Sequence, residues 1–153
     1  MLASPRDEST SQAAVERNQL TDNVSKTDLV VIVDDDELVR QALESVVKAA
    51  GFTTETFGSA EDFLDSIPMN SATCLILDVR LPGMSGIELQ RRLRAKNSGI
   101  PIIFVTAHGD ASTRDRAMED GAARFLNKPV RRQTLLDAIH AALERGQPGE
   151  SPC

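Results

Sequence analysis

The sequence of 153 residues has few aromatic residues and few cysteines. It contains five Phe, no Trp and no Tyr, so a core must be built mainly from aliphatic side chains. Two cysteines, Cys74 and Cys153, are too few for a disulfide framework or a zinc site. Cys74 lies in the apolar run TCLIL and is expected to be a small buried residue.

The sequence also lacks membrane, secretory and basic features. No apolar run approaches the ~20 residues that cross a bilayer, and the N-terminus lacks the basic-then-apolar order of a secretory signal. We therefore expect a cytoplasmic protein without membrane contact. The net charge of −6 disfavours nucleic-acid binding, which needs a basic surface, although this charge could serve solubility alone.

Both ends of the chain are polar. Residues 1–27 are rich in Ser, Thr, Asp, Asn and Gln, and are expected to form a flexible N-terminal extension. A short frayed helix around 13–20 would be compatible with this composition. Residues 147–153 are expected to form a flexible C-terminal tail. The folded unit should therefore span 28–146.

Within that unit, short apolar runs alternate with longer stretches of helical spacing. The runs are LVVIV (29–33), TTETF (53–57), TCLIL (73–77), PIIFV (101–105) and ARFL (123–126). Apolar strands separated by helices predict a parallel sheet that is covered on both faces. Because crossovers between parallel strands are right-handed, we expect an α/β fold of five βα units, (βα)₅, in a doubly wound arrangement.

Helix boundaries are also readable. Gly51 should end the first helix, Ser59 with Asp62 should begin the second, and Ser85 with Glu88 forms a capping box for the third. The first helix is expected to bury one apolar face, made of Leu38, Ala42, Leu43, Val46, Val47 and Ala50.

Polar side chains follow four of the five predicted strands. Asp34 and Asp35 follow the first strand, Asp78 the third, Thr106 the fourth and Lys128 the fifth. Open parallel sheets place their sites at this carboxyl edge. Carboxylates suit Mg²⁺, a carboxylate can attack phosphorus, and an ammonium and a hydroxyl can stabilise phosphoryl oxygens.

Each of these residues also has a simpler interpretation. The acidic run 34–37 could cap a helix, Asp78 could be a turn residue, Thr106 could cap the next helix, and Lys128 could be solvated. Their joint position at four strand ends favours a phosphoryl-transfer site.

The stretches VDDDE, LDVRLPGMSGIEL, VTAHGD and GAARFLNKPV resemble the signature blocks of response-regulator receiver domains, the CheY-like family. These motifs are most similar to those of FixJ-type receivers, and the resemblance covers residues 29 to about 145. It implies a flavodoxin-like sheet with strand order 2-1-3-4-5 and a role in two-component signal transduction.

The resemblance implies a role for each site residue. Asp78 would be the phosphoacceptor. Asp35 would bind Mg²⁺ directly and Asp34 mainly through water, with the backbone carbonyl of Arg80 completing the metal shell. Pro82 and Gly86 would shape the loop that follows.

Three further residues would contact the phosphoryl group. Thr106 and the backbone N–H of Ala107 would bind its oxygens, and Lys128 would pair with another, with a cis bond between Lys128 and Pro129.

Phosphorylation would draw in Thr106, and Phe125 would follow by packing alone, because Phe lacks the hydroxyl of the commoner Tyr. Phe125 could instead be permanently buried. The output face would be 111–121 with 123–145, for partner binding or a homodimer.

The expected partner is a sensor histidine kinase, with a small phosphodonor as a substitute. The chain would not be a turnover enzyme, because it would catalyse only its own phosphorylation and dephosphorylation. A haloacid-dehalogenase-type phosphatase is disfavoured, because Arg80 occupies the place of its second aspartate. His108 and Arg80 could tune the lifetime of the phosphate, although His108 could equally be a surface loop residue.

Two alternatives remain open: a receiver-like interaction module that works without phosphorylation, and a fragment of a transcription factor. FixJ-type receivers usually precede a DNA-binding domain.

Overall fold

A computed structural model describes residues 28–66 and 72–145. The two predicted terminal segments and Ile67, expected in the second helix, lie outside these ranges. The strands are β1 (Leu29–Val33), β2 (Thr53–Phe57), β3 (Cys74–Leu77), β4 (Ile102–Thr106) and β5 (Arg124–Asn127). The helices are α3 (Glu37–Ala49), α4 (Ala60–Ser66), α5 (Gly86–Ala95), α6 (Ala111–Glu119) and α7 (Arg132–Arg145).

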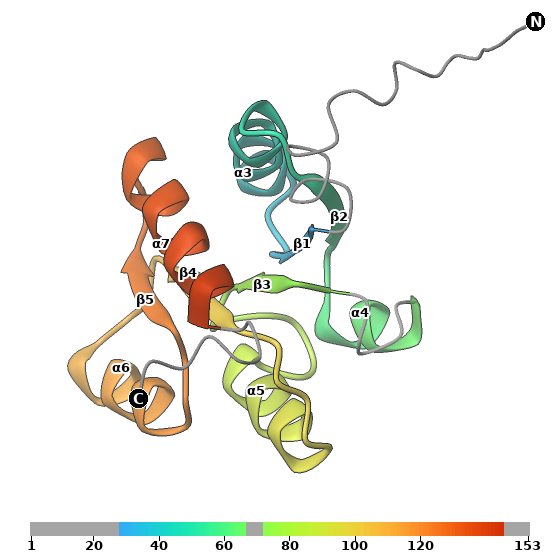
Figure 1. Ribbon diagram of the computed structural model, residues 1–153. Coiled ribbons are helices and arrows are strands. Elements are labelled where there is room, and N and C mark those ends of the chain that lie inside the picture. The colour runs from blue at the N-terminus through green and yellow to red at the C-terminus, as the bar shows by residue number, and fades with distance from the viewer. Residues whose placement is uncertain (1–27, 67–71, 146–153) are drawn as a thin grey trace, which may run out of the picture.

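All strand pairs are parallel, and the sheet order is β2-β1-β3-β4-β5. This confirms the predicted order 2-1-3-4-5. Helices α3 and α7 cover one face of the sheet and α4, α5 and α6 the other, so the molecule has three layers (Figure 1). Among the described residues, no helix is long and apolar enough to cross a membrane.

The core has two halves because successive strand residues point to opposite faces. Val30 and Ile32 of β1 pack toward α3 and α7, whereas Val31 and Val33 pack toward the other three helices. The central strands β1, β3 and β4 are almost wholly buried, and the edge strands β2 and β5 are partly exposed. This accounts for the polar content of the outer strands.

The predicted caps form. Asp36 accepts from the N–H groups of Leu38 and Val39 at the start of α3, and Ser85 accepts from Glu88 N–H at the start of α5. Ser59 accepts from Asp62 N–H. Gly51 follows α3 with a φ of +102°, a conformation that favours glycine.

The predicted apolar face of α3 is partly wrong. Leu38 is 76% exposed, and Ala42 and Ala50 are exposed as well. The buried stripe passes instead through Val39, Leu43 and Val47, four residues apart. Leu38 lies one residue, and therefore about 100°, away from that stripe.

Candidate functional site

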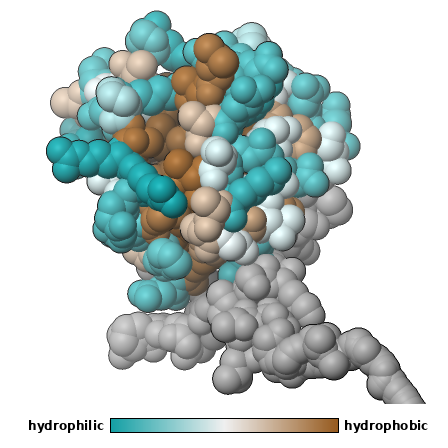
Figure 2. Space-filling view, turned by 90° about the horizontal axis from the view of Figure 1, so that it is seen from above, coloured by the Kyte–Doolittle hydropathy of each residue, from teal (hydrophilic) through white to brown (hydrophobic). Residues whose placement is uncertain are grey.

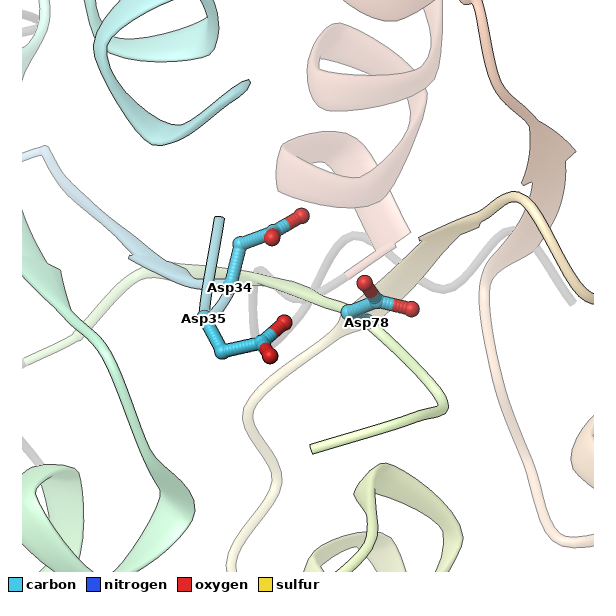
Figure 3. Close-up of side chains that lie close together, drawn as sticks. All are labelled: Asp34, Asp35 and Asp78. Carbon is cyan, nitrogen blue, oxygen red and sulfur yellow. The ribbon is translucent and has the colours of Figure 1, made fainter. Parts of the chain in front are cut away.

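Three carboxylates converge at the carboxyl edge of the sheet. Asp34 and Asp78 are buried, with 1% and 5% of their surface exposed, and Asp35 is exposed. Carboxylate oxygens of all three lie within 4.8 Å of one another. Figure 3 shows the three side chains directed toward a common space, from the ends of β1 and β3.

Parallel strand pairing produces this convergence. Asp34 N–H donates to the carbonyl of Phe57 in β2, and Asp78 N–H donates to that of Val33 in β1, at 3.1 Å each. The ladder therefore continues one residue beyond the strands. It holds the backbone of both aspartates in register.

Lys128 connects two of the carboxylates. Its Nζ lies 2.8 Å from Asp34 Oδ2 and 2.9 Å from Asp78 Oδ2. The bond between Lys128 and Pro129 is cis, as expected from the sequence. The structure thus brings the ends of β1, β3 and β5 into one cluster.

Burial and pairing shape the electrostatics of this cluster. Loss of solvent raises the pKa of Asp34, assisted by the charge of Asp78, while hydrogen bonds from Lys128 and Asp36 N–H oppose the rise. For Lys128, loss of solvent alone would lower the pKa, but hydrogen bonds and charge from Asp34 and Asp78 outweigh it and raise the pKa. The ammonium therefore stays protonated.

The residues of the acidic run after β1 occupy two structural positions, the cap of α3 and the carboxylate cluster. Asp36 caps α3, whereas Asp34 faces the cluster and accepts from Asp36 N–H at 2.9 Å through Oδ1. The interpretation of the run as a helix cap is confirmed for Asp36, and Asp34 lies in the carboxylate cluster. The side chain of Arg40 donates to the carbonyl of Asp34 at 2.8 Å. Sequence reasoning missed Arg40, because nothing in the helical pattern marks a side chain that turns back toward a strand end.

Thr106 ends β4 and is fully buried. Its Oγ1 accepts from His108 N–H at 3.1 Å, and its carbonyl accepts from Lys128 N–H at 2.9 Å. The interpretation of Thr106 as the cap of the next helix is wrong, because Asp110 caps α6. Ala107 and His108 are exposed beside it.

Phe125 is half-buried in β5. Its ring lies 5.8 Å from that of Phe104, centroid to centroid, and it contacts Gly109, where any side chain would overlap the ring. Gly109 therefore leaves room for Phe125 in this position. The sequence pattern does not predict the contact between Gly109 and Phe125, because residues in separate elements share no local periodicity.

Gly86 lies against the end of β3. A side chain at Gly86 would overlap the carbonyl oxygen of Asp78, and its N–H donates to the carbonyl of Val79 at 2.8 Å. It is therefore more than a turn residue. Arg80 N–H donates to Asp78 Oδ1 at 3.3 Å, so the loop begins with a contact to the carboxylate.

An apolar groove opens beside Lys128. Its lining consists of Val39, Ala42, Leu43, Val105, Ala107, Lys128, Pro129 and Val130. Figure 2 shows hydrophobic residues gathered in a band between hydrophilic ones on the upper side of the molecule.

The donor set fits a hard divalent cation. Three carboxylates face one ammonium, so one divalent cation would balance the remaining negative charge. Mg²⁺ prefers a few carboxylate oxygens and keeps several waters, which suits a cluster with one exposed member, Asp35. Asp34, Asp35 and Asp78 are the residues that would hold it.

Comparison with known proteins assigns the family. The family model for the response regulator receiver domain matches residues 30–140, and the chain belongs to this family of two-component signalling proteins. The CheY-like fold seen here is the fold of its structural neighbours.

The chain is similar to several characterised regulators. It is 47% identical over 117 residues to nodulation protein W of Bradyrhizobium diazoefficiens, covering 76% of this chain and 52% of that protein. The solved structure of response regulator StyR has a TM-score of 0.74 at 49% identity, covering 78% of this chain and 61% of that one. The crystal structure of FixJ-N has a TM-score of 0.70 at 39% identity, and the match covers 76% of this chain and 94% of that one. The chain spans about half the length of the curated relatives it matches.

Proposed function

We propose that Asp78 accepts a phosphoryl group from a sensor histidine kinase or a small phosphodonor in a Mg²⁺-dependent reaction. The observation that carries the proposal is the double ion pair of Lys128 with Asp34 and Asp78, beside a third carboxylate. Such a cluster combines a nucleophile, a cation-binding set and a fixed positive charge at one sheet edge.

The chemistry follows from these groups. A carboxylate oxygen of Asp78 attacks phosphorus, the bond from phosphorus to the donor atom breaks, and its electron pair leaves with the donor. The Lys128 ammonium, the Thr106 hydroxyl and the Ala107 N–H stabilise charge on the phosphoryl oxygens. Bound Mg²⁺, with the Arg80 carbonyl as a further ligand, would supply charge neutralisation there.

The aspartyl phosphate later loses its phosphoryl group to water. The chain therefore catalyses only its own phosphorylation and dephosphorylation, and is a signalling phosphoacceptor rather than a turnover enzyme. Residues 28–146 form the receiver unit, between the extension 1–27 and the tail 147–153.

Asp78→Asn tests the assignment. With acetyl phosphate and Mg²⁺, the wild type should gain the mass of one phosphoryl group and Asp78→Asn should gain none. Asp115→Asn removes an exposed carboxylate from α6 and should behave as wild type. A gain of one phosphoryl mass by the Asp78→Asn variant would refute the assignment. A wild-type chain that is never labelled would favour an interaction module that works without phosphorylation.

The output of this site would be the face formed by α6, β5 and α7. Phe125 would shift its packing when Thr106 moves toward the phosphate, and the face would bind a partner or a second copy of the chain. Control of transcription would then act through an output domain or partner outside this sequence. Sedimentation with beryllofluoride and Mg²⁺ should show a dimer, and an unchanged monomer would contradict dimerisation through this face.

A further inference from the structure

Glu61 makes a contact that the proposed chemistry does not use. It lies in the first turn of α4 with an exposed side chain. Its Oε2 accepts from the backbone N–H of Met84 at 2.9 Å, across 23 positions of sequence. The acceptor belongs to a helix on the face of the sheet, and the donor belongs to the loop between β3 and α5.

This loop directly follows Asp78, the proposed phosphoacceptor. It leaves Asp78 with the Arg80 N–H donating to Asp78 Oδ1, and it returns at Gly86, which donates to Val79. Both ends are therefore held close to Asp78. Between these two ends, the hydrogen bond from Met84 N–H to Glu61 holds the tip of the loop.

Gly83 lies beside the same carboxylate. Its φ is +74°, and a methyl group added there would lie 2.5 Å from Glu61 Oε2. Glycine thus provides both the backbone conformation and the space that the carboxylate occupies. Gly83 therefore leaves room for Glu61 in this position.

The contact is also charge-assisted. The Met84 N–H is the main cause that lowers the pKa of Glu61, and the charge of Arg92 adds to it. Glu61 is therefore ionised at neutral pH. Hydrogen bonds to ionised carboxylates are stronger than those between neutral groups.

We propose that Glu61 is a positioning residue for the phosphorylation site: through Met84 it fixes the loop, and the loop presents the Arg80 carbonyl to Mg²⁺. The inference rests on the proposed function, because it concerns the predicted metal shell. Glu61 itself touches neither metal nor phosphoryl group.

The test compares Glu61→Ala, Glu61→Gln and Asp65→Ala in the full chain. Asp65 is an exposed carboxylate on the same helix, so its loss matches the charge change. Phosphorylation by acetyl phosphate is measured across Mg²⁺ concentrations. In the metal-free protein, hydrogen exchange of the Met84 amide is measured by NMR.

Glu61→Ala should raise the half-saturating Mg²⁺ concentration about three- to tenfold, below the effect typical of residues that contact metal ligands directly. The maximal rate at saturating Mg²⁺ should change less than about twofold, because the reacting groups are intact. Met84 exchange should accelerate without metal. Glu61→Gln retains an acceptor oxygen and should recover most of both properties, and Asp65→Ala should match wild type.

If the wild-type chain binds Mg²⁺ and is phosphorylated, two results would overturn the role of Glu61 and leave the proposed function intact. One is an equal Mg²⁺ requirement in Glu61→Ala and Asp65→Ala, and the other is unchanged Met84 exchange in Glu61→Ala. A wild-type chain that neither binds Mg²⁺ nor accepts a phosphoryl group would refute the proposed function and this inference together.

Discussion

Two ion-pair clusters in the molecule have mirrored compositions. In one, the cation Lys128 lies between two carboxylates, Asp34 and Asp78. In the other, the carboxylate of Asp120 lies between two guanidinium groups, those of Arg91 and Arg94. The first joins strand ends at the sheet edge, and the second joins α5 to the end of α6.

Burial and distance separate the two clusters. The side chain of Lys128 is 17% exposed and its ion pairs measure 2.8 and 2.9 Å. Arg91 and Arg94 are 57% and 62% exposed, and their pairs measure 3.7 and 3.2 Å. Exposed pairs contribute little to stability. A buried pair costs desolvation, and its loss leaves an uncompensated charge. A gain in stability therefore does not by itself account for the buried cluster.

The largest effect is expected from Lys128→Met. It leaves Asp34 and Asp78 facing each other without a cation, so the free energy of unfolding without Mg²⁺ should fall by about 2–4 kcal/mol. Mg²⁺ should restore part of this loss, because it replaces the missing positive charge. Urea denaturation with and without Mg²⁺ measures both.

Lys48→Met is the matched control, because Lys48 pairs with Glu44 at 3.4 Å on the surface of α3. Its loss should cost less than about 0.5 kcal/mol. Equal losses in the two lysine variants would contradict the distinction between buried and exposed clusters.

An intermediate effect of opposite sign is expected from Asp34→Asn. Because burial raises the pKa of Asp34 in the folded protein, its contribution to stability is complete below the ordinary aspartate pKa of about 3.9. The contribution is lost as the pH rises through the folded value. At pH 7, without Mg²⁺, Asn should therefore increase the free energy of unfolding by about 1 kcal/mol.

This gain should vanish near pH 3, where Asp34 is protonated in both states. Urea denaturation over this pH range provides the measurement. A constant difference between Asp34→Asn and wild type at all pH values would show that packing, not charge, separates them.

The smallest effect is expected from Arg94→Gln in the exposed cluster. It should change the free energy of unfolding by less than about 0.5 kcal/mol, and salt should reduce even that difference. Thermal unfolding at low and high NaCl concentrations tests it. A larger loss would mean that Asp120, whose side chain is only 24% exposed, depends on its pair with Arg94.

The sequence predicted those parts of the structure that repeat along the chain. Strand spacing located all five strands within a residue, and the side chains of Ser59 and Ser85 accept from helix N–H groups as the capping patterns predicted. The clustering of Asp34, Asp35, Asp78 and Lys128 could be predicted because parallel strands all end at one sheet edge. Their proximity therefore followed from topology alone.

Other features could not be predicted because they depend on tertiary contacts of single side chains. Leu38 fits the helical pattern yet faces solvent, since the sheet contacts a neighbouring stripe of α3. Arg40 and Glu61 resemble ordinary exposed charges in the sequence. Their backbone partners, in Asp34 and Met84, become visible only in three dimensions.

The close contact of Gly86 with the Asp78 carbonyl makes the packing on the two sides of this residue unequal. On the α5 side, the backbone of Gly86 lies so close to this carbonyl that a side chain at Gly86 would overlap it. On the opposite side, Phe125 lies over Gly109, a residue without a side chain. We expect a bulky group added to Asp78 to be accommodated toward β4 and β5 rather than toward α5.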